Sequence, residues 1–217
     1  MNRLPDKYFD QMYSSSVDPW ELSTRWYEQR KYAITLAMLP RRHYRHAFEP
    51  GCSIGVLTAL LTRRCEQVTA TDVAAAALDI ARRRLDDAGR GGQVTLLRRS
   101  IDETWPRGPF DLVVLSEVGY YLTAHALGGA LDRECPYLEP GTTIIAAHWR
   151  HRVQDYPMSG EDANEVIART AGLHRVGRYR DPDVVIEVFD TTSGLSVAQR
   201  TGIPGAGLTT VPDADGE

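Results

Sequence analysis

A short turn between two predicted strands carries most of the chemistry that this sequence suggests. The turn runs Phe48-Glu49-Pro50-Gly51-Cys52-Ser53-Ile54-Gly55, and residues 67–71 then lead to Asp72. Apolar residues at helical spacing lie between the two segments, which predicts a strand, a helix and a second strand. Open α/β sheets bind nucleotides at the carboxyl ends of such strands. Asp72 lies 21 positions after Gly51, where a carboxylate can accept hydrogen bonds from both hydroxyls of a ribose. The sequence offers Asp72 no other evident partner.

The glycine spacing of the turn distinguishes between two kinds of nucleotide site. The dinucleotide pattern G-x-G-x-x-G is not met, because position 53 is Ser and position 56 is Val. We expect Gly51 to let the backbone approach a ligand, and Gly55 to let the helix pack tightly on the strand. An acidic residue followed by x-G-x-x-x-G resembles the first motif of the class I S-adenosylmethionine-dependent methyltransferases. That resemblance implies S-adenosylmethionine as cofactor, with the following contacts: Glu49, Gly51, Cys52, Gly55, Asp72 and Val73.

The composition predicts one cytoplasmic domain. A chain of 217 residues that is 42% hydrophobic can bury a full core. Its net charge of −4 gives no basic field for nucleic acid or for an anionic membrane. No apolar stretch approaches the ~20 residues of a membrane span, and residues 1–6 lack the apolar core of a signal peptide. Three cysteines without a C-x-x-C pair argue against a disulfide scaffold or a zinc module.

Strands and helices alternate through the middle of the chain, which predicts a mainly parallel sheet. Residues 1–46 are expected to be helical and aromatic, 47–192 to form the core, and 193–217 to form a disordered tail. The predicted strands are 46–50, 67–71, 93–99, 110–116, 142–148, 173–179 and 184–190. The predicted helices are 55–64, 73–88, 124–138 and 160–171. Only residues 180–183 separate the last two strands, too few for a parallel crossover. The expected fold is α/β: a class I methyltransferase (Rossmann-like) fold with a seven-stranded, mostly parallel sheet, an antiparallel terminal hairpin and an N-terminal helical lid.

Two further segments are expected to reach the cofactor. In Arg98-Arg99-Ser100-Ile101-Asp102, Ser100 stands where the superfamily usually has an acidic residue beside adenine. We therefore predict adenine contacts from Ser100, Ile101 and Asp102. The apolar strand at 112–115 delivers four further residues to the cofactor edge: Ser116, Glu117, Tyr120 and Tyr121. Core packing is the alternative role of the two tyrosines.

The sequence also resembles a narrower family, the nodulation protein S (NodS-like) methyltransferases. The resemblance covers roughly residues 8–190. It is carried by these segments: 18–20 (Asp-Pro-Trp), 26–32 (Trp-Tyr-Glu-Gln-Arg-Lys-Tyr), 49–55, 115–121, 147–150 (Ala-His-Trp-Arg) and 156–160 (Tyr-Pro-Met-Ser-Gly). It implies S-adenosylmethionine as cofactor and nitrogen as the methyl acceptor. Because the founding members methylate the free amine of a chitooligosaccharide, it also points to a sugar or another small molecule.

The chemistry of methyl transfer assigns roles to the remaining residues. Displacement at a sulfonium mainly needs alignment of the acceptor, and an amine must be neutral to attack. Glu117, Tyr120 and His148 are the candidate catalytic groups, although His148 could equally be structural. We place Tyr121, Arg150 and Asp155 with the acceptor, although the polar loop that carries Arg150 and Asp155 could equally be a solvated one. The i, i+3 pair of His148 and His151 lacks further ligands, so no metal is predicted.

The N-terminal aromatic block has two possible roles. Trp20, Trp26, Tyr27 and Tyr32 could pack a helix on the sheet, or could cover the cofactor cleft as a lid. Trp20 and Arg30 are predicted cofactor contacts, since Arg30 and the neighbouring Lys31 could meet the methionine carboxylate. Three alternative functions remain: an O-methyltransferase acting on a small metabolite, an NAD-dependent oxidoreductase, and a non-catalytic cofactor-binding module.

Overall fold

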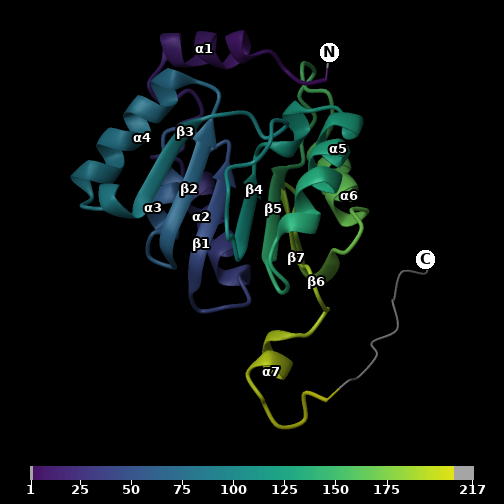
Figure 1. The fold of residues 1–217 in the computed structure, drawn as a ribbon. Coiled ribbons are helices and arrows are strands. Elements are labelled where there is room, and N and C mark those ends of the chain that lie inside the picture. The colour runs from purple at the N-terminus through teal and green to yellow at the C-terminus, as the bar shows by residue number, and fades with distance from the viewer. Residues whose placement is uncertain (1, 208–217) are drawn as a thin grey trace.

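The computed structural model describes residues 2–207 and has a seven-stranded sheet with helices on both faces (Figure 1). The strands are β1 (Tyr44–Pro50), β2 (Cys65–Asp72), β3 (Val94–Arg98), β4 (Leu112–Ser116), β5 (Thr143–Trp149), β6 (His174–Arg180) and β7 (Val184–Asp190). The helices are α1 (Asp6–Ser15), α2 (Trp26–Met38), α3 (Val56–Leu61), α4 (Ala75–Asp87), α5 (Ala124–Glu134), α6 (Gly160–Ala168) and α7 (Val197–Arg200). Short 3₁₀ turns are η1 (Gly91–Gln93), η2 (Gly119–Tyr121) and η3 (Cys135–Tyr137).

The strand order is β3-β2-β1-β4-β5-β7-β6. The first five of these strands are parallel, and β7 pairs antiparallel with both β5 and β6. The predicted class I methyltransferase architecture with a reversed terminal hairpin is confirmed. The parallel strands end at one edge of the sheet, and α1 crosses above that edge (Figure 1).

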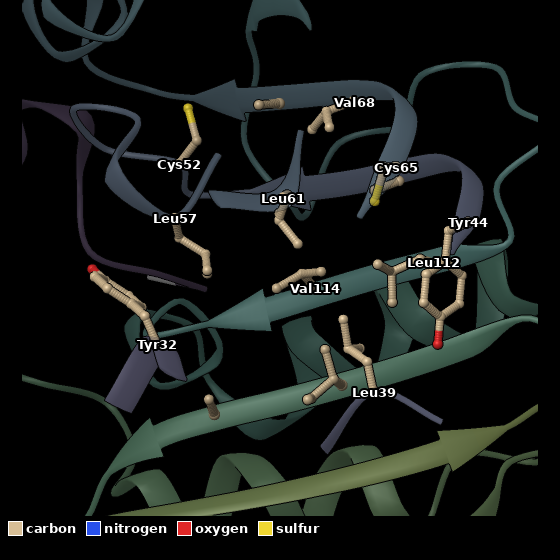
Figure 2. Close-up of a cluster of buried hydrophobic side chains, with 14 of the residues drawn as sticks. Tyr32, Leu39, Tyr44, Cys52, Leu57, Leu61, Cys65, Val68, Leu112 and Val114 are labelled. Atoms are coloured by element: carbon tan, nitrogen blue, oxygen red, sulfur yellow. The ribbon is translucent and has the colours of Figure 1, made fainter. Parts of the chain in front are cut away.

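Two apolar clusters hold the layers together. The first joins α2, α3 and α4 to one face of the sheet, and Figure 2 shows Leu57 and Leu61 of α3 in this cluster with Val114 of β4. The second joins α5 and α6 to the opposite face through Leu127, Leu131 and other buried residues. The inner strands β4, β5 and β7 are therefore buried on both faces, most completely in the apolar run of β4.

The predicted elements agree with the structure except at some helix ends. Every predicted strand is present, with bounds within two residues. Helix α3 is shorter than predicted, because the carbonyl of Arg64 already accepts the amide of Tyr44 at the start of β1 (2.8 Å). Helix α5 ends at Glu134, since Pro136 cannot donate to the helical ladder and the chain continues as η3. Helix α6 ends at Ala168 rather than at 171.

The C-terminal segment differs from the predicted disordered tail where the structure describes it. Residues 193–207 include α7, which a capping box of Ser196 and Gln199 begins. Arg200 holds this segment to β7 through an ion pair with Asp190 at 2.6 Å. Residues 208–217, the rest of the predicted tail, lie outside the described part of the chain. Within residues 2–207, none of the helices has the length and apolar character that crossing a membrane requires.

Candidate active site

A cavity of about 490 Å³ lies at the carboxyl edge of the parallel strands. The loops after β1, β2, β3 and β4 form one side of it, and residues between Arg3 and Tyr32 form the other. The predicted site residues that line it are Trp20, Glu49, Gly51, Cys52, Asp72, Val73, Ser100, Ile101, Ser116, Glu117, Tyr120 and Tyr121. The fold thus brings most of the predicted site together.

The turn after β1 depends on the backbone freedom of Gly51. Its φ is +74°, and a Cβ there would lie 2.9 Å from a methyl carbon of Val118. Gly51 and Cys52 both donate their amides to the carbonyl of Thr71, at 2.7 and 2.9 Å, which ties the turn to the end of β2. Any side chain at position 51 would push the turn away from Val118, across the floor of the cavity.

Gly55, a predicted cofactor contact, does not line the cavity. Its φ is +75°, and an added Cβ would lie 3.0 Å from Cβ of Ala81. Gly55 therefore allows α3 to start close to α4, whereas the sequence suggested close packing on a strand.

Asp72 has partners that the sequence did not indicate. Its carboxylate accepts the amide of Ser53 at 2.9 Å and the amide of Ala74 at 2.9 Å. Burial raises the pKa of Asp72, and these amides act in the opposite direction. A carboxylate has about four lone-pair positions, so these amides leave room for a ligand hydroxyl. Asp72 therefore stabilises the turn and is also a candidate ligand of the ribose.

Glu49 is almost completely buried beside the same turn. Burial raises its pKa to about 8, and the negative charge of Asp72 adds to the shift. Its Oε2 has no hydrogen-bond partner among the described residues. A buried polar atom that lines a cavity and lacks a partner is suited to a polar ligand.

The predicted adenine contacts are partly corrected. Ser100 and Ile101 are buried and line the cavity. Asp102 does not line it, because its carboxylate forms an ion pair with Nε of Arg3 at 3.2 Å. Asp102 therefore anchors the N-terminal segment.

Glu117 is the most heavily engaged carboxylate of the cavity. One oxygen lies 2.7 Å from Nζ of Lys31, and the other accepts the amide of Trp149 at 2.9 Å and the hydroxyl of Tyr120. Burial acts to raise the pKa of Glu117, but the Lys31 ammonium outweighs it and the pKa is lowered. Glu117 is therefore ionised at neutral pH and is a weak base. Its backbone has φ +54°, in the left-handed region, which turns the carboxylate toward these partners.

Lys31 is buried between two carboxylates. It lies 2.8 Å from Glu28, one turn earlier on α2, and 2.7 Å from Glu117. Burial acts to lower its pKa, but the charges of Glu117 and Glu28 reverse this and raise it. The ammonium also lies over the ring of Tyr27, 5.2 Å from its centroid. Of the two residues expected to meet the methionine carboxylate, Lys31 lines the cavity, whereas Arg30 pairs with Asp181 at 2.7 Å and does not line it.

His148 is not a base in this structure, contrary to one of the two roles considered for it. It is fully buried and does not line the cavity. Its Nε2 accepts the amide of Gly119 at 3.0 Å, and its Nδ1 lies 2.6 Å from Oδ1 of Asn164. Both ring nitrogens are thus occupied by protein groups, and its role is structural.

Two predicted acceptor contacts also lie outside the cavity. Arg150 pairs with Glu161 at 2.5 Å and donates to the carbonyl of Asp181. Asp155 is an exposed loop residue that does not line the cavity. Their loop leads to α6 and lies beside the cavity, which Val153 and Tyr156 reach instead. Among residues 2–207, no group of three or more His, Cys, Asp or Glu side chains could hold a metal ion.

The N-terminal aromatic block both packs and lines the cavity. Trp20 meets Tyr13 edge-to-face (centroids 5.7 Å apart), and Tyr27 meets Trp149 in the same way (4.9 Å). Trp26 is the exception, with 73% of its surface exposed. The block forms one wall of the cavity, the position that a lid requires.

Several residues that line the cavity were not predicted as site residues. Tyr13 hydrogen-bonds to Ser53 and Phe9 contacts Tyr121, and no spacing in the sequence pointed to either contact. Glu28 could have been found, because it stands at i, i+3 from Lys31 on one face of α2.

Comparison with known proteins assigns this chain to a family. The profile of the family described as "Nodulation protein S (NodS)" matches residues 10–176. The nodulation protein S of Bradyrhizobium diazoefficiens is 32% identical over 153 residues, covering 70% of this chain and 72% of that protein. The chain belongs to the nodulation protein S family. A second family member, from Rhizobium tropici, is 31% identical over 106 residues, which cover 48% of this chain and 43% of that protein.

Solved structures agree with the family and with the fold. A protein from Pseudomonas syringae that is assigned to the methyltransferases is 36% identical, with a TM-score of 0.65 over 76% of this chain and 99% of that one. The N-methyltransferase NodS from Bradyrhizobium japonicum WM9, in complex with S-adenosyl-L-homocysteine, shares the fold: its TM-score is 0.73 at 24% identity, over 83% of this chain and 97% of that one. This member of the nodulation protein S family is an S-adenosylmethionine-dependent methyltransferase.

Proposed function

We propose that this protein transfers the methyl group of S-adenosylmethionine to an amine nitrogen of a small-molecule acceptor. The observation that carries the proposal is the ionised carboxylate of Glu117, held beside Tyr120 in a cavity whose lining includes nine aromatic side chains. A carboxylate next to aromatic faces attracts an ammonium group or an amine that is becoming cationic. Its low pKa makes binding and orientation, rather than proton abstraction, the role of Glu117.

The turn after β1 supplies groups that suit the cofactor. Asp72 keeps room for a ribose hydroxyl, and Glu49 has an unpartnered oxygen beside the cavity. The buried Ser100 can meet the polar edge of the adenine base, and the buried Ile101 offers an apolar surface for its face. When bound, S-adenosylmethionine supplies a methyl group on a positively charged sulfur.

The acceptor end of the cavity is aromatic. The ring of Tyr120 stacks with that of Tyr156 (centroids 5.0 Å apart), and Tyr121 meets Tyr156 edge-to-face at 4.8 Å. Phe9 of α1 contacts Tyr121 from above. These rings present apolar faces that can align an acceptor for in-line transfer, and alignment is the main demand of this reaction. The attacking amine must be neutral, and its proton is lost to water before or after transfer.

The test is the formation of S-adenosylhomocysteine with a panel of small amines and with alcohols of matched shape. We expect turnover with an amine and none with its alcohol counterpart. Turnover with alcohols alone would identify an O-methyltransferase instead. Calorimetry with S-adenosylmethionine and with NAD tests the cofactor, and binding of NAD alone would overturn the proposal.

Glu117→Gln tests the acceptor role, because it keeps the shape of the side chain and removes its charge. We expect turnover to fall about tenfold or more, since hydrogen bonds to charged groups contribute roughly 1.5–3 kcal/mol. The dissociation constant of S-adenosylmethionine should stay close to that of the unaltered protein. A parallel loss of both would place Glu117 in the cofactor site. Glu134→Gln is the matched control, a buried glutamate paired with Arg133 outside the cavity.

A further inference from the structure

A chain of buried hydrogen bonds connects the acceptor end of the cavity to the terminal hairpin. The amide of Gly119 donates to Nε2 of His148 (3.0 Å), and Nδ1 of His148 meets Oδ1 of Asn164 (2.6 Å). Nδ2 of Asn164 then donates to Oε2 of Glu187 (2.9 Å). The three side chains are 0%, 2% and 3% exposed, and none lines the cavity.

The chemistry of the groups fixes the direction of every bond in this chain. The carboxylate of Glu187, which pairs with two arginines, accepts from Asn164, so the amide nitrogen of Asn164 faces it and the amide oxygen faces His148. That oxygen needs a proton on Nδ1 of His148, which leaves the lone pair on Nε2. The lone pair is what the amide of Gly119 requires. A charge at one end therefore selects the histidine tautomer at the other.

Glu187 also forms ion pairs with two arginines on the surface side of the sheet. Arg175 and Arg178 of β6 lie 3.0 and 3.4 Å from its Oε1, and both are about half exposed. The chain of contacts thus joins β6, β7, α6 and β5 to the loop after β4.

Gly119 occupies the middle of the segment that carries the acceptor-binding groups. A Cβ at Gly119 would lie 2.9 Å from Nε2 of His148, so the loop sits directly on the imidazole. The ring of Tyr120 also meets that of His148 edge-to-face at 5.3 Å. Glu117, two residues before Gly119, is in the left-handed conformation that such an anchor can maintain.

From these contacts we infer that Asn164 and Glu187 are positioning residues for methyl transfer, which act through His148 on Gly119 to hold Glu117 and Tyr120 in place. The inference rests on the proposed function, because it assigns these two side chains to the acceptor. The inference gives the terminal hairpin a role in the reaction, because Glu187 of β7 helps to hold the loop of residues 117–121 in place.

The experiment compares His148→Leu and Asn164→Leu with the conservative His148→Gln. Leucine removes the hydrogen bonds at similar volume, whereas the glutamine oxygen can still accept the amide of Gly119. Glu161→Gln on α6 is the control, since the side chain of Glu161 is 42% exposed and pairs with Arg150 and Arg180 rather than with the buried chain. For each variant, kcat and KM are measured with the amine of the panel that the unaltered protein methylates fastest. The dissociation constant of S-adenosylmethionine and the hydrogen exchange of the peptide that contains residues 117–121 are measured as well.

For the two leucine variants we expect kcat to fall about tenfold to a hundredfold, the range that a misplacement of about 1 Å can cause. Hydrogen exchange of the 117–121 peptide should become faster, while cofactor affinity changes less than about threefold, because only contacts of the acceptor loop are lost. His148→Gln should keep more of the activity than His148→Leu. Unchanged kcat and exchange in Asn164→Leu, or equal losses in the two His148 variants, would overturn the inference. If His148→Leu does not fold, Asn164→Leu and His148→Gln decide.

The hydrogen-exchange measurement keeps this inference separate from the proposed function. If the unaltered protein methylates no amine, the proposed function fails. Faster exchange at 117–121 in Asn164→Leu would still support the positioning role of the chain. Unchanged exchange together with normal turnover in the unaltered protein would refute the positioning role alone.

Discussion

Nζ of Lys31 lies 2.7 Å from the carboxylate of Glu117, although the two residues are 86 positions apart in the sequence. The contact joins α2 of the N-terminal segment to the loop after β4 at the floor of the cavity. Only 2% of the Lys31 side chain is exposed, and Glu28 approaches it from the other side. The N-terminal wall and the carboxylate proposed to bind the acceptor are therefore parts of one electrostatic unit.

Lys31→Met should destabilise the protein by about 3 kcal/mol, because it leaves the buried carboxylate of Glu117 without its cation. Adding Glu117→Gln to that variant should recover part of the loss, and a double-mutant cycle in urea measures the difference. The pKa of Glu117 is lowered in the folded state, so its contribution is present at neutral pH and is lost as the pH falls through the folded value. The coupling should therefore weaken in acid. Arg25→Ala is the exposed control, and if it costs as much as Lys31→Met, burial is not the cause.

Asp72→Ala should weaken S-adenosylmethionine binding at least about tenfold, since each hydrogen bond to a charged group contributes roughly 1.5–3 kcal/mol. Because the carboxylate also accepts the amides of Ser53 and Ala74, the cofactor-free variant should melt at a lower temperature too. Asp190→Ala is the matched control. Asp190 is a buried carboxylate at the end of β7 that accepts the amides of Thr192 and Ser193, far from the cavity. Calorimetry should show a loss of affinity for Asp72→Ala alone, and equal losses would remove Asp72 from the site.

The sequence predicts the fold well, because the fold depends on periodicity and loop length. The apolar run in β4 and the short connection at 180–183 are local signals, and both predictions are confirmed. Helix ends were less predictable, since Arg64 and Pro136 end their helices through contacts or turns that a periodic pattern does not show.

The candidate site was harder to predict where its residues depend on orientation. Glu28, Lys31, Tyr32 and Thr35 form the buried face of α2 at helical spacing, but charged residues on that face conceal the pattern. The sequence therefore favoured Arg30 over its neighbour Lys31. His148 was placed at the correct strand end, but its partner Asn164 comes from a helix whose packing no local signal reveals.

Glu49→Gln should change how stability depends on pH. Burial raises the pKa of Glu49 to about 8, so the folded protein keeps a proton there that the unfolded chain releases at the usual value of 4.5. Stability must then fall as the pH rises through this window. Glutamine has no proton to lose, so the melting temperature of the variant should rise relative to that of the unaltered protein between about pH 5 and pH 9, by the linkage just described. Glu165→Gln is the control, because Glu165 is exposed and pairs with an arginine, Arg169; a difference that does not depend on pH would show that Glu49 is ionised throughout.

Gly51→Ala should impair both the turn and cofactor binding. The new Cβ would lie 2.9 Å from Val118, and φ +74° is unfavourable for alanine by about 1–2 kcal/mol. Gly89→Ala measures the cost of the backbone conformation alone, because Gly89 has φ +67° but no atom lies within 4 Å of an added Cβ. We expect Gly51→Ala to lower the melting temperature more than Gly89→Ala and to weaken S-adenosylmethionine binding, which Gly89→Ala should leave unchanged. Adding Val118→Ala to Gly51→Ala removes the clash and should restore part of the affinity. If Gly51→Ala binds the cofactor normally, the turn after β1 is not the cofactor cradle.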